Sequence, residues 1–232
     1  MSQAHPERLP MFAQLWFQAK QLALFLLSLY FLPLLLLIAV VVASSHMGVE
    51  IARFTRDPAD ILNIHPLTGV ISNLGAILWA AAATICLFSW AILRNSIGEA
   101  RFATFLLCSG LITTFLLFDD FFLLHDYIFP RYLGVREKVV FIGYAGLILW
   151  GTAVFWKDIL KTEYLILLTA FGFFGLSLFI DAFQDRIESI IGPTRILFED
   201  GFKLLGIVGW LGYFTRSALS RLASTLHASV KR

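Results

Sequence analysis

Six long runs of apolar residues constrain this chain more than any other feature of its sequence. Each run has close to the roughly 20 residues that a helix needs to cross the hydrocarbon core of a bilayer. The runs cover residues 22–43, 70–93, 102–124, 139–156, 164–183 and 196–214. Because lipid cannot satisfy exposed backbone polar groups, only internally hydrogen-bonded helices suit such runs. The sequence therefore predicts an all-α polytopic membrane helix bundle with about six transmembrane helices.

The composition supports a membrane protein. A soluble domain carries about 25% charged residues, whereas this chain of 232 residues has 15% charged and 59% hydrophobic residues. The first apolar run is too long for the core of a secretory signal peptide, so we expect it to be retained as a span. The net charge of +2 does not indicate a nucleic-acid partner. The expected partners are membrane lipids and other membrane proteins.

The distribution of charge predicts the orientation. Cytoplasmic loops of membrane proteins carry an excess of Lys and Arg. With the N-terminus in the cytoplasm, ten of the 18 basic residues and only four of the 16 acidic residues fall on the cytoplasmic side. We therefore expect both termini to be cytoplasmic. The acidic face is then non-cytoplasmic, in a bacterial-type plasma membrane or another internal membrane.

Two flanking segments differ from the spans between them. Residues 1–21 place aromatic side chains before Lys20, which is typical of an interfacial segment. Residues 215–232 set leucines at helical spacing against basic residues. This pattern predicts a basic amphipathic tail for an anionic leaflet, or else an ordinary helix extension whose arginines reach the interface. The expected organisation is these two segments around a transmembrane domain over residues 22–214.

Acidic residues gather where the apolar runs end on the outer face. Asp119 and Asp120 border continuous apolar sequence, where a charge near mid-bilayer depth costs about 2.5–3.5 kcal/mol. Asp181, Asp185 and Glu188 have the spacing i, i+4 and i+7, which predicts one acidic stripe on a single helix. A carboxylate in such a place usually holds a cation, a metal ion or a proton.

These positions predict a site for a divalent metal. Oxygen ligands with an imidazole suit Zn, Ca, Mg, Mn or Fe, so the residues do not identify the metal. The candidate metal ligands are Asp119, Asp120, His125, Asp126, Asp181, Asp185 and Glu199. The alternative is that these carboxylates face water at the helix ends and pair with basic residues such as Arg195 or Lys203. The chain contains no HExxH or paired CxxC motif that would decide between the two.

Three sequence elements carry a resemblance to a known family. Ser72-Asn73 opens one run, Ser109-Gly110 leads to Asp119-Asp120 on the next, and the last run holds Glu199 and Lys203 ahead of Gly209 and Tyr213. This arrangement resembles the alkaline-ceramidase-like (CREST-type) membrane hydrolase superfamily, which has a seven-helix bundle and a zinc site. The resemblance implies a metal-dependent hydrolase with Ser72 and Asp119 at catalytic positions. Glu199 and Lys203 stand where that family has two zinc-binding histidines, which implies that the metal is changed or lost.

A second resemblance rests on aspartate spacing. Asp119-Asp120 with Asp126, and Asp181 with Asp185, are similar in outline to the two aspartate-rich motifs of membrane prenyltransferases, which bind Mg-diphosphate. The six apolar runs are fewer than the nine spans of that family, and the first spacing differs. The hydrolase resemblance therefore ranks first.

Three functions follow from these patterns. The first is a metal-dependent hydrolase that acts on a lipid or an amphiphile at the outer head-group level. The second is a non-catalytic subunit, assembly factor or receptor of a membrane complex, because no complete catalytic motif is present. The third is cation or proton transport, which ranks last because the middles of the runs lack ionisable residues.

Overall fold

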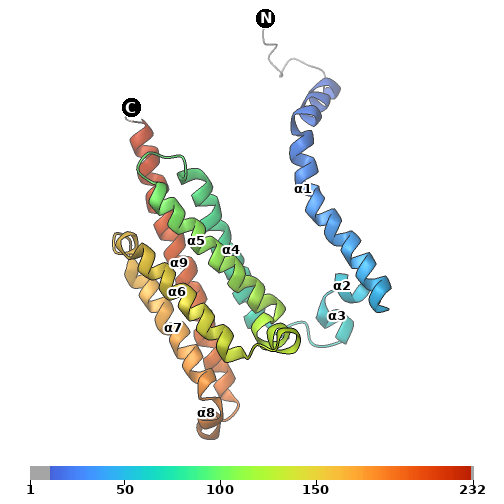
Figure 1. Cartoon of the computed structure of the whole chain (residues 1–232), viewed down its shortest axis with the longest axis vertical. Helices are drawn as coiled ribbons and strands as arrows, with labels where there is room; N and C mark the ends of the chain where they lie inside the picture. The colour runs from blue at the N-terminus through green and yellow to red at the C-terminus, as the bar shows by residue number, and fades with distance from the viewer. Residues whose placement is uncertain (1–10, 231–232) are drawn as a thin grey trace, which may run out of the picture. The chain divides into compact units, whose positions relative to one another are not determined.

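A computed structural model describes residues 11–230, which form helices and turns without a β-strand in that range. The chain divides into two units, residues 1–68 and 69–232 (Figure 1). The first unit contains α1 (Met11–Met47), α2 (Ala52–Thr55) and α3 (Pro58–Leu62). The second contains α4 (Val70–Leu93), α5 (Ala100–Phe122), the π-helix η2 (Leu124–Leu133), α6 (Glu137–Ile159), α7 (Tyr164–Ala182), α8 (Gln184–Ile191) and α9 (Thr194–Val230). Residues 1–10 of the predicted interfacial segment and residues 231–232 of the predicted tail lie outside the described residues.

Five helices in the described part of the chain are long and apolar enough to cross a membrane. They are Leu22–Met47 within α1, and the whole of α4, α5, α6 and α7. These helices coincide with the first five predicted runs to within a few residues, so the prediction of an all-helical membrane protein is confirmed. The sixth predicted run, 196–214, lies inside α9, a helix of 37 residues. That helix is not among the five, and it continues through residue 214 without a break.

The centre of the second unit is α9, which packs against both α4 and α7. Trp210 of α9 meets Trp79 of α4 edge to face, with 6.0 Å between ring centroids. The indole N–H of Trp210 donates a hydrogen bond to Thr113 Oγ1 of α5 at 3.0 Å, which satisfies a polar group inside an apolar core. Because other helices cover α9, it can cross the bundle with a less apolar sequence than a lipid-facing helix needs.

Two glycines allow α7 and α9 to approach closely. A Cβ atom at Gly206 would lie 2.6 Å from Phe174 Cδ1, and one at Gly209 would lie 3.0 Å from Ala170 Cβ. Small residues at such contacts let two helix backbones pack closely in a membrane. Gly206 and Gly209 of the last apolar run therefore form a packing surface for α7.

Ion pairs connect the helices at one end of the second unit. Arg101 of α5 pairs with Asp158 of α6 at 2.6 Å, Arg216 of α9 pairs with Glu163 before α7, and Arg221 of α9 pairs with Glu99 before α5. The opposite end contains the last turns of α5 and α7, the first turns of α4, α6 and α9, and both η2 and α8. We call it the acidic end, because the carboxylates singled out in the sequence lie there.

Candidate functional site

The site begins where α5 ends. Leu123 follows the last residue of α5 with φ of 52°, in the left-handed region that residues with a Cβ atom rarely adopt. The chain then continues as η2 from Leu124. This turn breaks the helical spacing after Asp120 and brings His125 back beside Asp119.

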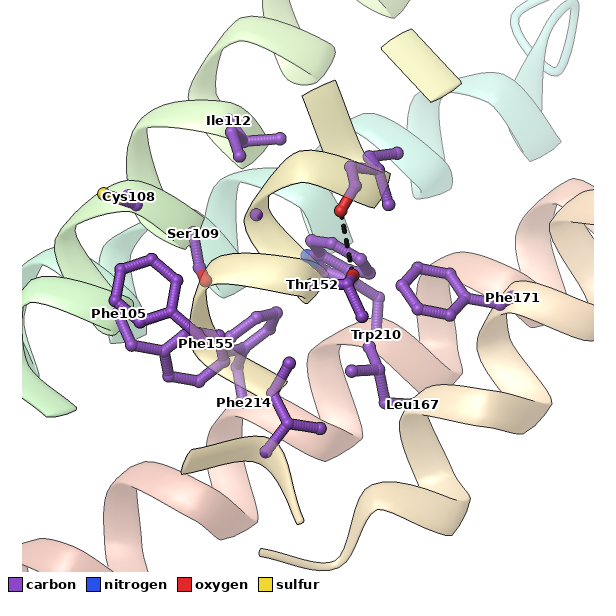
Figure 2. Close-up of a pocket in the computed structure, with 13 residues that line it drawn as sticks. Phe105, Cys108, Ser109, Ile112, Thr152, Phe155, Leu167, Phe171, Trp210 and Phe214 are labelled. Atoms are coloured by element: carbon purple, nitrogen blue, oxygen red, sulfur yellow. Dashed lines mark hydrogen bonds between the residues drawn. The ribbon is translucent and has the colours of Figure 1, made fainter. Parts of the chain in front are cut away.

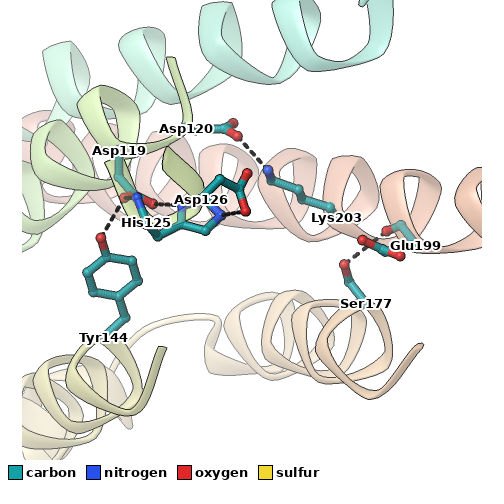
Figure 3. Close-up of polar contacts among 8 residues, drawn as sticks. All are labelled: Asp119, Asp120, His125, Asp126, Tyr144, Ser177, Glu199 and Lys203. Carbon is teal, nitrogen blue, oxygen red and sulfur yellow. Dashed lines mark hydrogen bonds and ion pairs between the residues drawn. The ribbon is translucent and has the colours of Figure 1, made fainter. Parts of the chain in front are cut away.

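Asp119 accepts three hydrogen bonds at the acidic end (Figure 3). The backbone N–H of His125 donates to Oδ1 at 3.0 Å, and Nδ1 of the same histidine lies 2.6 Å from Oδ2. The hydroxyl of Tyr144 on α6 donates to Oδ1 at 2.6 Å. Only 4% of Asp119 is exposed. These donors explain how a buried carboxylate is accommodated next to apolar sequence.

The other ring nitrogen of His125 faces a second carboxylate, and a third lies close by. Nε2 lies 3.4 Å from Asp126 Oδ1. Ligand atoms of His125, Asp126 and Glu137 all lie within 4.8 Å of one another. In the neutral imidazole, a proton on Nδ1 directed at Asp119 leaves the lone pair of Nε2 free to bind a metal. We call His125, Asp126 and Glu137 the three-ligand cluster.

The donor set of the three-ligand cluster fits a divalent metal. The cluster offers one imidazole, which is a borderline ligand, and two carboxylates, which are hard ligands. Zn, Mn and Fe all accept this combination. Ligand atoms bound at about 2.1 Å lie roughly 3–3.5 Å apart, and the His125–Asp126 separation of 3.4 Å already has this value. The side chain of Asp126 is 49% exposed, which leaves one side of the cluster open to water.

Charges around His125 favour its protonated form when no metal is bound. Burial lowers the pKa of His125, but the hydrogen bond to Asp119 and the charges of Asp119 and Asp126 raise it. The charge of Lys203 lowers it, and the net result is a pKa above the ordinary value of histidine. A metal ion at Nε2 would therefore have to displace a proton, which is the usual competition at such sites.

Asp120 lies on a different side of α5 from Asp119. Lys203 of α9 places Nζ 2.5 Å from Asp120 Oδ1, whereas Oδ2 is buried without a hydrogen-bond partner among the described residues. The two residues line a pocket with Ser72, from the first turn of α4. Asp120 and Ser72 therefore belong to a second polar site, separate from the three-ligand cluster.

The remaining predicted ligands have other surroundings. Glu199 pairs with Arg195 one turn earlier on α9, and Arg195 also contacts Glu188 at 3.4 Å. Asp185 is exposed on α8. Asp181 is half-buried near the end of α7 and is an electrostatic neighbour of both Glu137 and Glu199.

The predicted acidic stripe on a single helix is wrong. Helix α7 ends at Ala182 and α8 begins at Gln184, with Phe183 outside the helical region between them. Asp181 therefore belongs to one helix, while Asp185 and Glu188 belong to the next.

Glu137 is the member of the cluster that the sequence analysis missed. It is the first residue of α6 and one of the twelve acidic residues expected on the outer face. Its position directly after the loop from η2 was the available signal, because a short connection returns α6 to the end where α5 finished.

An apolar pocket lies among α5, α6, α7 and α9 (Figure 2). On α6 its lining runs from Ile148, one turn after Tyr144, to Ile159, the last residue of the helix. On α5 it reaches Ile112, seven residues before Asp119. The pocket therefore begins near the middle of the bundle, about 10 Å along α5 from Asp119, and extends toward the end opposite the acidic end.

Residues 29–217 match a protein family described as a domain of unknown function, DUF8692. The chain belongs to this family. The DUF8692 region includes Asp119, the three-ligand cluster and the pocket beside Asp120. No curated protein and no solved structure matches the chain.

Proposed function

We propose that the protein is a metal-dependent membrane hydrolase whose divalent metal binds His125, Asp126 and Glu137. The observation that carries this proposal is the fixed imidazole. Asp119 holds Nδ1 of His125, Nε2 faces Asp126, and Glu137 completes a cluster whose ligand atoms lie within 4.8 Å of one another. Three protein ligands with an open position are typical of catalytic metal sites. A bound divalent ion would supply the Lewis acidity that makes water nucleophilic near neutral pH.

The surrounding residues position the imidazole. The Tyr144 hydroxyl and the His125 backbone together fix the carboxylate of Asp119. The ring of Phe141 lies against His125, with 4.9 Å between centroids, and shields the ring from water. Asp119 is thus a positioning residue in this proposal, and the exposed side of Asp126 is the route for water and substrate.

The proposed substrate is a lipid or an amphiphile that enters from the bilayer. Six spans with both termini cytoplasmic would place the acidic end at the non-cytoplasmic head-group level, where a polar head can meet the three-ligand cluster. The apolar pocket lies deeper in the bundle, about 10 Å or more along α5 from Asp119, and its lining residues, such as Phe155 and Phe171, suit the far end of an acyl chain.

Metal analysis of the purified protein tests the proposal. We expect about one Zn, Mn or Fe per chain by elemental mass spectrometry after detergent purification. His125→Gln and Glu137→Gln should each lower metal affinity by at least about tenfold. Asp185→Asn is the matched control, because it removes an acidic residue at the same end that is exposed on α8.

Hydrolysis is tested separately with fluorescent short-chain ester and amide lipids. Activity should disappear with a chelator and return with the metal. The proposal would be contradicted if the purified protein bound no stoichiometric metal. It would also be contradicted if the His125→Gln variant retained the full metal content. Either result would favour a non-catalytic subunit of a membrane complex.

A further inference from the structure

A second polar site lies beside the three-ligand cluster. A small pocket opens between α4 and α9 next to the end of α5. Its polar lining consists of Ser72, Asp120, Asp200 and Lys203. Apolar residues of α4 and α9 complete the lining: Ile71, Gly75, Leu204 and Ile207.

The chain leaves one acceptor in this pocket without a partner. Only 9% of Asp120 is exposed. Lys203 occupies Oδ1, and Oδ2 has no hydrogen-bond partner within the described range. A buried carboxylate oxygen without a donor is destabilising by about 1–3 kcal/mol or more. A donor from outside the chain would satisfy it.

The charges of the pocket indicate which kind of donor fits. Asp120 and Asp200 are negative and Lys203 is positive, so the lining carries one net negative charge. No Lys or Arg in the described part of the chain forms a salt bridge with Asp200. The lining therefore favours a cation over a neutral or anionic group.

The number of acceptors favours a primary ammonium. Oδ2 of Asp120, the carboxylate of Asp200 and the hydroxyl of Ser72 are three acceptors, and a primary ammonium has three N–H donors. A hydroxyl has one donor and no charge, and a quaternary ammonium has the charge but no N–H donor. We propose that this pocket binds a primary ammonium group and so holds the amine end of an amphiphile, a role in substrate binding that rests on the proposed hydrolase function.

Gly75 keeps the pocket open. A Cβ atom there would lie 3.9 Å from Asp120 Oδ2 and 3.2 Å from Ile207 Cδ1. Gly75→Ala therefore fills space beside the unpaired oxygen without changing any charge.

The pocket and the three-ligand cluster are neighbours. Asp119 and Asp120 are consecutive, and they bind His125 and Lys203 respectively (Figure 3). The charge of Lys203 is close enough to act on His125. A molecule anchored by its ammonium in the pocket would thus present an adjacent bond to the metal centre.

The test measures binding of small probes to the full-length protein. The protein is stripped of metal with a chelator and embedded in phosphatidylcholine nanodiscs, and binding is followed by ligand-observed NMR. Ethylammonium should bind at least about tenfold more tightly than ethanol or tetramethylammonium. Gly75→Ala and Asp200→Asn should each weaken ethylammonium binding by about tenfold or more, while Asp185→Asn should change it by less than about twofold.

A second arm identifies the source of the amine. The ethylammonium titration is repeated in nanodiscs that contain phosphatidylethanolamine. If phosphatidylethanolamine displaces ethylammonium, the pocket binds the head group of a lipid. If ethylammonium binding is unchanged, the pocket binds a free amine. Both results support an ammonium site.

Two results would overturn the proposal. One is ethylammonium binding no tighter than ethanol, and the other is equal binding by wild type and Asp200→Asn. Asp200 is exposed, so the second variant should keep its fold even if Gly75→Ala does not. Because the metal is absent from these titrations, a failed metal analysis and a failed ammonium site give distinguishable results.

Discussion

The carboxylate of Asp119 holds His125 at two points, because the His125 backbone N–H donates to Oδ1 at 3.0 Å and ring Nδ1 lies 2.6 Å from Oδ2. One contact fixes the chain at the start of η2, and the other fixes the rotation of the imidazole. A histidine oriented through its second nitrogen by a carboxylate is the usual arrangement at metal sites. The left-handed turn at Leu123 makes this double contact available between residues six positions apart.

Asp119→Asn should weaken metal binding although it removes no member of the three-ligand cluster. The amide keeps the shape of the side chain but loses the charge that orients His125, and loss of such a partner lowers metal affinity by about 10–100-fold. Zinc affinity is measured by competition with a fluorescent chelator. Asp200→Asn at the same end of the bundle is the control. Wild-type affinity in Asp119→Asn would show that the contact has no role in metal binding.

Tyr144→Phe should destabilise the acidic end. It deletes a 2.6 Å hydrogen bond to the buried carboxylate of Asp119, and hydrogen bonds to charged groups contribute about 1.5–3 kcal/mol. Thermal unfolding in detergent, followed by tryptophan fluorescence, should show a lower midpoint. Tyr132→Phe, at a site that is 74% exposed, should melt like the wild type. Equal midpoints for the two variants would contradict the expectation.

Lys203→Met should destabilise the protein because it leaves the carboxylate of Asp120 buried without a counter-charge. Breaking a fully buried pair costs about 3–5 kcal/mol. We expect about 1–3 kcal/mol here, because the Lys203 side chain is 39% exposed. The double variant with Asp120→Asn should recover most of this loss, and exposed Lys138→Met serves as the control. Additive effects of the two single changes would argue that the pair is not coupled.

Gly206→Ala should destabilise the packing of α7 against α9. The new Cβ would overlap the ring of Phe174, which is stacked on Trp79 with 5.7 Å between centroids. Overpacking costs about 1–3 kcal/mol, more than the roughly 0.5–1 kcal/mol that alanine gains in helix propensity. Gly201→Ala on the same helix has no atom within 4 Å of the new Cβ and should be neutral or stabilising. A higher unfolding midpoint for Gly206→Ala would refute the close contact.

The stability of the metal-free protein should depend on pH through His125. Its pKa in the folded protein is raised above the ordinary histidine value of 6.5. The stabilisation is therefore fully present below about pH 6.5 and is lost as the pH rises through the folded pKa. His125→Gln should lower the unfolding midpoint more at about pH 5.5 than at about pH 9. His46→Gln, which removes an exposed histidine, is the control, and an effect of equal size at both pH values for His125→Gln would contradict the prediction.

Much of the acidic end could be predicted from the sequence. Asp119 and Asp120 stood out because they border continuous apolar sequence, and the structure gives both of them strong polar partners. The ion pair between Glu199 and Arg195 follows from their spacing of four residues on α9. The short connection after η2 could place Glu137 at the same end, but not beside His125, because the turn at Leu123 replaces the expected helical spacing.

The sequence by itself determined the helices of this protein. Runs of about 20 apolar residues can satisfy their backbone in lipid only as helices, and the first five runs are found as such. Only the tertiary structure decided which charges meet. Lys203 could have paired with Glu199 or Asp200 on its own helix, yet it pairs with Asp120, 83 residues away. Helices such as α6 and α7 are apolar on nearly every face, so their sequences do not specify which faces pack together. That packing determines the partner of each buried charge.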